Sequence, residues 1–150
     1  MRSKKSNESK ITVPSAHDWR TTDTDEINKR RLRAREESFA ISNLDARHPI
    51  FSNFRVQSGS GMTYEVEVRD LSQRQFTCNC VDFRINGLGT CKHVEAVLMN
   101  LEARFRRLCQ AAARSGSTRI DLVPDPARNT LRLVNGTDPL PRAVRDWFDA

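Results

Sequence analysis

The alternation of apolar and polar residues predicts a short antiparallel β-meander in the middle of the chain. Between residues 64 and 69, Tyr and Val alternate with Glu and Arg, so one face of this strand is apolar. A strand at 54–57 leads into it across the turn-forming stretch 58–61, and a third strand is expected at 75–80. One face of the third strand carries Phe76, Cys78 and Cys80.

A long amphipathic helix is predicted from Cys91 to Ala113, because its apolar residues recur at the 3.6-residue spacing of a helix. These residues are Val94, Val97, Leu98, Leu101, Phe105 and Leu108. Thr90 is a suitable N-cap, and the stretch 115–117 ends the helix. Earlier in the chain, good helix formers with sparse apolar residues predict another helix over residues 23–46.

The two ends of the chain differ from its centre. Residues 1–22 are rich in Lys, Ser and other polar residues, which predicts a disordered basic tail. Residues 118–150 contain two short strand patterns and then an amphipathic turn, which predict a β-hairpin and a short C-terminal helix. The pattern as a whole predicts an α+β fold, with helical and β-hairpin extensions on either side of a central unit at 50–114.

Composition narrows the class of protein. The 150 residues are 37% hydrophobic and carry a formal net charge of +6, which favours a modest core and an anionic partner. No run approaches the roughly 20 apolar residues of a membrane span. The basic N-terminus lacks the apolar segment of a secretory signal. We therefore expect a cytoplasmic protein, or a nuclear one in a eukaryote, whose cysteines stay reduced.

Three of the four cysteines and one histidine form a C-x-C-x(10)-C-x-H array. Three thiolates and one imidazole are the ligand set of a closed tetrahedral zinc site, so we expect one structural Zn²⁺. The ligands are Cys78, Cys80, Cys91 and His93. On a regular strand the Cα atoms of Cys78 and Cys80 would be about 6.7 Å apart, whereas two sulfurs bound to one zinc lie within about 4 Å of each other. The strand should therefore bend or end at Cys80. Cys109 would lie about 27 Å further along the long helix and is expected to be a structural thiol.

Two other interpretations of the array remain. The cysteines can be buried core residues beside an unrelated histidine. Cys91 and His93 can also be a nucleophile and its base, but they share one helical turn and nothing supplies an oxyanion hole, so we do not expect an enzyme. Asp82 and Glu95 flank the site, where either can accept the free N–H of His93 or act as an ordinary loop cap.

The array resembles the SWIM-type zinc finger, which has C-x-C, a variable gap and C-x-H. The similarity extends to 80–83 (Cys-Val-Asp-Phe) and to 91–97 at the helix start, and it covers about residues 54–105. The sequence of residues 83–93 is most similar to the N-terminal SWIM segment of bacterial SWI/SNF-type helicases. The resemblance implies a ββα zinc fold that binds DNA or protein. No G-x-x-x-x-G-K-[ST] loop occurs, so this chain would accompany such an ATPase or be the N-terminal part of one.

Basic residues gather near the predicted zinc site and on the first helix, as a phosphate-binding face requires. The candidate DNA contacts are Arg84, Lys92, Arg104, Arg106, Arg107, Arg114, Lys29, Arg30, Arg31 and Arg33. The alternative is an ordinary solvated helix face. We therefore expect a module that binds DNA, mainly through phosphates, in a helicase or remodelling system, and no membrane partner. The alternative function is a protein–protein adaptor that uses the same zinc fold.

Overall fold

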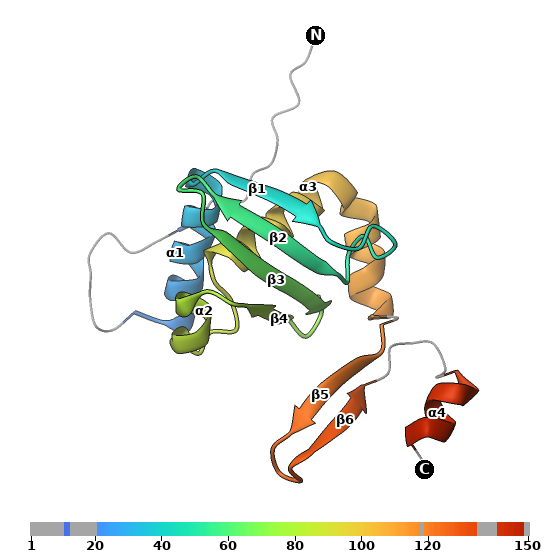
Figure 1. Ribbon diagram of the computed structural model, residues 1–150. Coiled ribbons are helices and arrows are strands. Elements are labelled where there is room, and N and C mark those ends of the chain that lie inside the picture. The colour runs from blue at the N-terminus through green and yellow to red at the C-terminus, as the bar shows by residue number, and fades with distance from the viewer. Residues whose placement is uncertain (1–10, 13–20, 118, 135–140, 149–150) are drawn as a thin grey trace.

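A four-stranded antiparallel sheet forms the centre of the protein, with its strands in the order β1-β2-β3-β4 (Figure 1). The fold is taken from a computed structural model that describes residues 11–12, 21–117, 119–134 and 141–148. The strands are β1 (Phe39–Asn43), β2 (Asn53–Ser58), β3 (Thr63–Asp70) and β4 (Gln75–Cys78). The predicted meander is confirmed, and β1 is added to one side of it.

The alternation in each strand separates a core face from a wet face. Phe54 and Val56 of β2 and Val66 and Val68 of β3 are buried, whereas the residues between them are exposed or half-buried. The buried side chains pack against the helix α3 (Lys92–Ser115), which contacts all four strands. The sheet thus has one covered face and one face open to solvent, the usual arrangement of a small α+β domain.

Three helices cover or extend the core face. The first, α1 (Asp23–Glu36), begins with a capping box in which Thr22 and Asp25 satisfy each other's backbone N–H groups. It lies against α3, and the short helix α2 (Val81–Asn86) connects β4 to the start of α3. The helix α3 is bent at Phe105, whose backbone angles are not helical. The predicted mixed α/β class, with an antiparallel sheet and a long helix, is confirmed.

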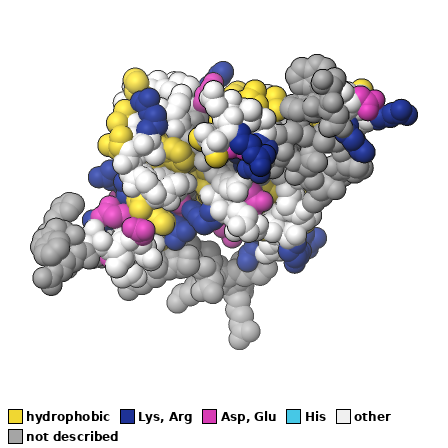
Figure 2. Space-filling model, turned by 90° about the horizontal axis from the view of Figure 1, so that it is seen from below, with side chains coloured by type: hydrophobic (Ala, Val, Ile, Leu, Met, Phe, Trp, Pro, Cys, Tyr) yellow, Lys and Arg dark blue, Asp and Glu magenta, His cyan; other side chains and the backbone are white. Residues whose placement is uncertain are grey.

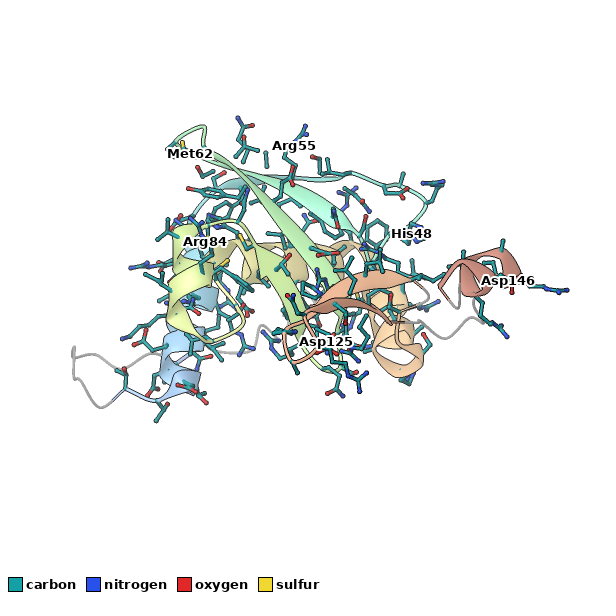
Figure 3. The ribbon with its side chains drawn as sticks, turned by 60° about the horizontal axis from the view of Figure 1, so that its bottom comes forward. His48, Arg55, Met62, Arg84, Asp125 and Asp146 are labelled. Carbon is teal, nitrogen blue, oxygen red and sulfur yellow. The ribbon has the colours of Figure 1, made fainter. Side chains whose placement is uncertain are left out.

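The C-terminal elements are separate from this sheet. The strands β5 (Asp121–Asp125) and β6 (Thr130–Val134) form the predicted hairpin, and α4 (Arg142–Phe148) follows. Within the described chain, β5 and β6 pair only with each other, and α4 lies against no other helix or strand. Figure 1 shows them projecting away from the sheet. Figure 3 labels Asp125 on β5 and Asp146 on α4. An ion pair from Arg119 to Glu67, with an N–O distance of 3.2 Å, attaches the base of the hairpin to β3.

Two sequence predictions need correction. The helix expected over 23–46 ends at Glu36, and residues 39–43 form β1, because Phe39 and Ile41 turn inward there and pair with β2. The third strand ends at Cys78 instead of Cys80, and residues 81–86 form α2, a helix that the sequence pattern did not predict. The tail predicted at 1–22 lies almost wholly outside the described residues.

Candidate metal centre

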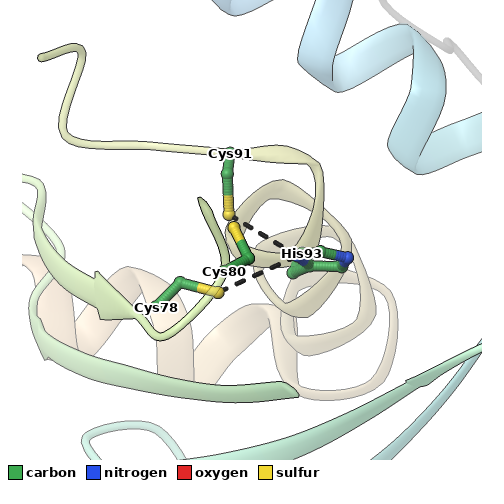
Figure 4. A group of neighbouring side chains, drawn as sticks. All are labelled: Cys78, Cys80, Cys91 and His93. Atoms are coloured by element: carbon green, nitrogen blue, oxygen red, sulfur yellow. Dashed lines mark hydrogen bonds between the residues drawn. The ribbon is translucent and has the colours of Figure 1, made fainter. Parts of the chain in front are cut away.

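The four residues of the C-x-C-x(10)-C-x-H array come together in the folded chain (Figure 4). Their ligand atoms, three sulfurs and one imidazole nitrogen, all lie within 4.8 Å of one another. His93 Nδ1 is 3.8 Å from Cys78 Sγ and 3.9 Å from Cys91 Sγ. All four residues are buried, and all four cysteines of the chain are free thiols. The predicted ligands therefore form one buried cluster.

Each ligand sits where a regular element begins or ends. Cys78 is the last residue of β4, and Cys80 is the N-cap of α2, where its sulfur accepts the backbone N–H of Phe83 at 3.3 Å. Cys91 is the N-cap of α3, and His93 follows in the first turn. Because β4 ends at Cys78, the two cysteines are not held at the distance that a continuous strand would impose on them. The negative charge of a metal-bound thiolate is also favoured at the N-terminus of α3.

The geometry and the acid–base chemistry of the cluster both fit a metal ion. Tetrahedral zinc bonds place sulfur and nitrogen ligands about 3.6 Å apart, close to the two distances found here. A hydrogen bond to Cys78, together with burial, raises the pKa of Cys91, and burial raises the pKa of Cys80. Three thiolates in so small a buried space need a cation to balance their charge. The cluster can therefore hold one metal ion.

The imidazole of His93 is oriented by aromatic rings. Tyr64 stacks on it with a ring-centroid distance of 3.9 Å, and Phe39 meets it edge-on at 5.6 Å. Nε2 of His93 is buried and has no hydrogen-bond partner, so neither Asp82 nor Glu95 accepts its proton. The usual carboxylate behind a metal-binding histidine is thus missing, and ring packing performs the orientation that a hydrogen bond would otherwise provide.

Replacing Tyr64 by Ala should therefore weaken Zn²⁺ binding about 10- to 100-fold, because the imidazole loses the ring that holds it in place. Tyr64→Phe keeps the ring and should bind Zn²⁺ within about twofold of the wild type. Competition with a chromophoric chelator measures both affinities.

A second measurement, the absorption spectrum with bound Co²⁺, distinguishes a change in the orientation of His93 from a general loss of stability. With saturating Co²⁺, the absorption spectrum of Tyr64→Ala should differ from that of the wild type, because Co²⁺ absorption reports the ligand geometry. Val68→Ala removes a fully buried side chain from the same strand and should leave that spectrum unchanged. Equal spectra for Tyr64→Ala and the wild type would show that the stacking does not orient His93.

The two flanking carboxylates instead connect helices. Glu95 is buried and accepts hydrogen bonds from Thr90 Oγ1 at 2.7 Å, Arg74 Nη2 at 2.7 Å and Arg31 Nε at 3.2 Å. It joins α1, α3, the turn after β3 and the chain before Cys91. Sequence reasoning missed this role, because the partners lie 5 to 64 residues away and no local pattern marks them.

Asp82 joins α2 to α1. Its carboxylate receives two hydrogen bonds from the guanidinium of Arg30, at 2.6 and 3.0 Å. Burial by itself would raise the pKa of Asp82, but the hydrogen bonds from Arg30 and Asn86 outweigh it, and the pKa lies below its usual value. Paired bonds of this kind fix orientation, so the Arg30–Asp82 pair connects α1 to α2 beside the Cys/His cluster.

The ten predicted DNA contacts divide into two groups. Four of them are in ion pairs within the chain: Lys29 with Glu26, Arg30 with Asp82, Arg31 with Glu95 and Lys92 with Glu37. The other six are exposed, and no ion pair joins them to another described residue; they are Arg33, Arg84, Arg104, Arg106, Arg107 and Arg114. Figure 2 shows Lys and Arg side chains scattered over one face of the molecule, with hydrophobic side chains exposed among them.

In the described chain, the other cysteine and His48 lie outside the Cys/His cluster. Cys109 is half-buried and packs against the core, as expected for a structural thiol. His48 lies 3.8 Å from Asp45 at the surface, and His17 lies outside the described residues. Leu108, predicted on the apolar stripe of the long helix, is 49% exposed, and it follows the bend at Phe105.

Comparisons with known proteins add no assignment. No protein-family model matches the chain, and no curated protein or solved structure matches it significantly. In the described part of the chain, no helix has the length and apolar character needed to cross a membrane. The Cys/His cluster is therefore characterised by its own residues and geometry.

Proposed function

We propose that this chain is a SWIM-type zinc module that binds DNA, mainly through the phosphate backbone, as an accessory part of a helicase or remodelling system. The observation that carries the proposal is the buried cluster of three cysteines and one histidine. The association with a helicase or remodelling system rests on the resemblance of residues 83–93 to such proteins.

A structural role for zinc follows from the ligand set. Four protein ligands complete a tetrahedral shell and leave no position for water or substrate, unlike catalytic zinc, which keeps one position open. The ligands come from the end of β4, the N-cap of α2 and the first turn of α3. Zinc in this place would hold these elements together, and the chain itself would not be an enzyme.

Support for phosphate binding comes from one side of α3. Arg107 and Arg114 are exposed there, and both follow the bend at Phe105. They are seven residues apart, which places them about 20° apart round the helix and about 10 Å along it. Arg104 precedes the bend and lines a different pocket, with Ile41 and Phe54. Arg106 lies about 100° away from Arg107 and lines an apolar groove with Leu98 and Cys109. We call Arg107 and Arg114 the α3 basic face, because these two can contact one strand of phosphates together.

The salt dependence of duplex DNA binding tests this proposal. If each residue of the α3 basic face neutralises one phosphate, log K should fall with log salt concentration with a slope of about −1.8. The double substitution Arg107→Glu/Arg114→Glu should reduce the size of that slope by about 1.8 and weaken binding strongly. Fluorescence anisotropy with labelled duplex at several salt concentrations gives both quantities.

A matched variant controls for the change in net charge. Arg55→Glu/Arg128→Glu alters two exposed arginines outside the α3 basic face, one on β2 and one near the tip of the hairpin, and should leave the slope nearly unchanged. Equal losses in the two double variants would show that only overall charge matters. No binding to duplex or single-stranded DNA at low salt would refute the DNA proposal.

The adaptor function remains the alternative, and one observation favours it. Four of the ten predicted phosphate contacts already pair with carboxylates of the same chain, so less positive charge is available for DNA than the sequence suggests. Both functions use the same zinc fold, and the DNA titration distinguishes them.

A further inference from the structure

The short helix α2 presents three different sides to its surroundings. Asp82 faces Arg30 of α1, and Phe83 packs against the core. The remaining side carries Val81, Arg84 and Ile85, which are all exposed. Val81 and Ile85 are one helical turn apart, so they lie next to each other on this side.

The exposure of these two aliphatic side chains is unusual for a folded domain. Val81 is 61% exposed and Ile85 is 77% exposed, and no residue of α2 is buried. Single exposed aliphatic residues are common, but a neighbouring pair on one rigid turn is typical of an interaction site. The turn is also rigid, because Cys80 caps its start and Asn86 at its end donates to Thr90 O at 2.9 Å.

The charges beside this pair are positive. Arg84 lies between Val81 and Ile85 in the sequence. Arg33 follows Arg30 by three residues on α1, so it lies on the same side of α1 as the arginine that pairs with Asp82. Arg84 and Arg33 are exposed, and no ion pair joins either of them to another described residue. Asp82 is the nearby acid, and Arg30 already neutralises it. A partner that covers this surface must therefore supply negative charge together with apolar side chains.

This surface is separate from the α3 basic face. Arg107 follows the bend of α3 at Phe105, whereas α2 precedes the first turn of α3. Figure 1 shows α2 and the C-terminal end of α3 on opposite sides of the molecule. A phosphate backbone offers no apolar group to Val81 and Ile85, whereas protein interfaces combine apolar anchors with arginine.

We propose that Val81, Arg84 and Ile85 of α2, with Arg33 of α1, form a docking site for an acidic amphipathic segment of a partner protein. Apolar side chains of the partner cover Val81 and Ile85, and its carboxylates pair with Arg84 and Arg33. The mode is that of an amphipathic helix bound through anchors one turn apart. This site goes beyond the proposed DNA binding and does not depend on it.

A synthetic peptide tests the site directly. The probe is a labelled amphipathic helix about 18 residues long with Leu on one side and Glu on the other. The full-length, zinc-loaded chain should bind it saturably in an anisotropy titration. Val81→Ser/Ile85→Ser should weaken binding at least about tenfold, and Arg84→Glu should have a similar effect. A peptide with Lys in place of Glu should bind at least about tenfold more weakly than the acidic one.

The controls use exposed aliphatic residues of the β5–β6 hairpin. Leu122 and Leu131 of the hairpin are 51% and 62% exposed, and Leu122→Ser/Leu131→Ser should leave peptide binding unchanged. Val81→Ser/Ile85→Ser should keep the wild-type zinc content and melting temperature, because both side chains are at the surface. These two measurements show that any loss of binding is local.

Four results would overturn the proposal. The first is no binding of the acidic peptide up to about 1 mM, a concentration at which even weak specific contacts are detected. The second is equal binding of the Lys peptide, and the third is equal loss in the hairpin variant. The fourth is a loss of duplex DNA affinity in Val81→Ser/Ile85→Ser as large as the loss for the peptide, which would make α2 part of the DNA face. Failure of DNA binding with retained peptide binding would refute only the DNA proposal.

Discussion

Replacing Cys91 by Ser is expected to abolish stoichiometric zinc binding and to unfold the region from the end of β4 to the first turns of α3. Structural zinc contributes on the order of 10 kcal/mol or more in small zinc modules at pH 7. The whole folding free energy of a domain is about 5–15 kcal/mol, so a bound zinc ion would decide whether this region folds. Metal analysis should find one zinc per wild-type chain and a small fraction of that in the variant.

Cys109→Ser is the matched control for this prediction. It removes a half-buried thiol from the same helix but outside the cluster, so the zinc content should stay at one per chain. Chelation of the wild type should reproduce the Cys91→Ser phenotype, with amide exchange accelerating in α2 and at the start of α3. A Cys91→Ser variant that retains zinc and native exchange rates would contradict the proposed ligand set.

Replacing Glu95 by Ala should destabilise the protein by about 3 kcal/mol. The carboxylate is 4% exposed, and its loss leaves Thr90, Arg31 and Arg74 without their acceptor. Removal of one partner from a buried ion pair costs about 3–5 kcal/mol, and we expect the lower end, because both arginines are partly exposed and can reach water. Urea denaturation with excess zinc present measures the difference.

Two further variants distinguish charge from packing at this position. Glu95→Gln keeps the shape and one acceptor oxygen, so we expect a smaller loss of about 1–2 kcal/mol. Glu65→Gln changes an exposed carboxyl of β3 and should alter stability by less than about 0.5 kcal/mol. If Glu95→Ala were as stable as Glu65→Gln, the connection of α1 to α3 through Glu95 would not contribute to stability.

The members of the Cys/His cluster could be predicted from the sequence, because the capacity to coordinate a metal depends on residue type and short spacing. Cys78 and Cys80 are two residues apart, as are Cys91 and His93, and each pair lies at the boundary of a predicted element. The long helix was equally visible, since its apolar stripe repeats over several turns. The aromatic contacts of His93 were not predictable, because Phe39 and Tyr64 lie on strands that are distant from it in the sequence.

The first helix shows the limit of local pattern. Residues 23–36 are helical, as predicted, but residues 39–43 become a strand because β2 pairs with them, with Ile41 opposite Val56. Helix propensity there is weak, and hydrogen bonds to a neighbouring strand outweigh it. The choice depends on a segment more than ten residues away.

For the charged residues, too, the sequence determined one part of the result and the fold determined the other. The sequence alone determined how many basic residues the chain has, where they cluster, and which four side chains can hold a metal ion. Only the tertiary structure decided that Arg30 and Arg31 pair with carboxylates 52 and 64 residues away, while Arg84 and Arg107 stay exposed. Ligand spacing and helical periodicity are local properties of the chain, whereas ion pairs and strand pairing depend on which distant residues the fold brings together.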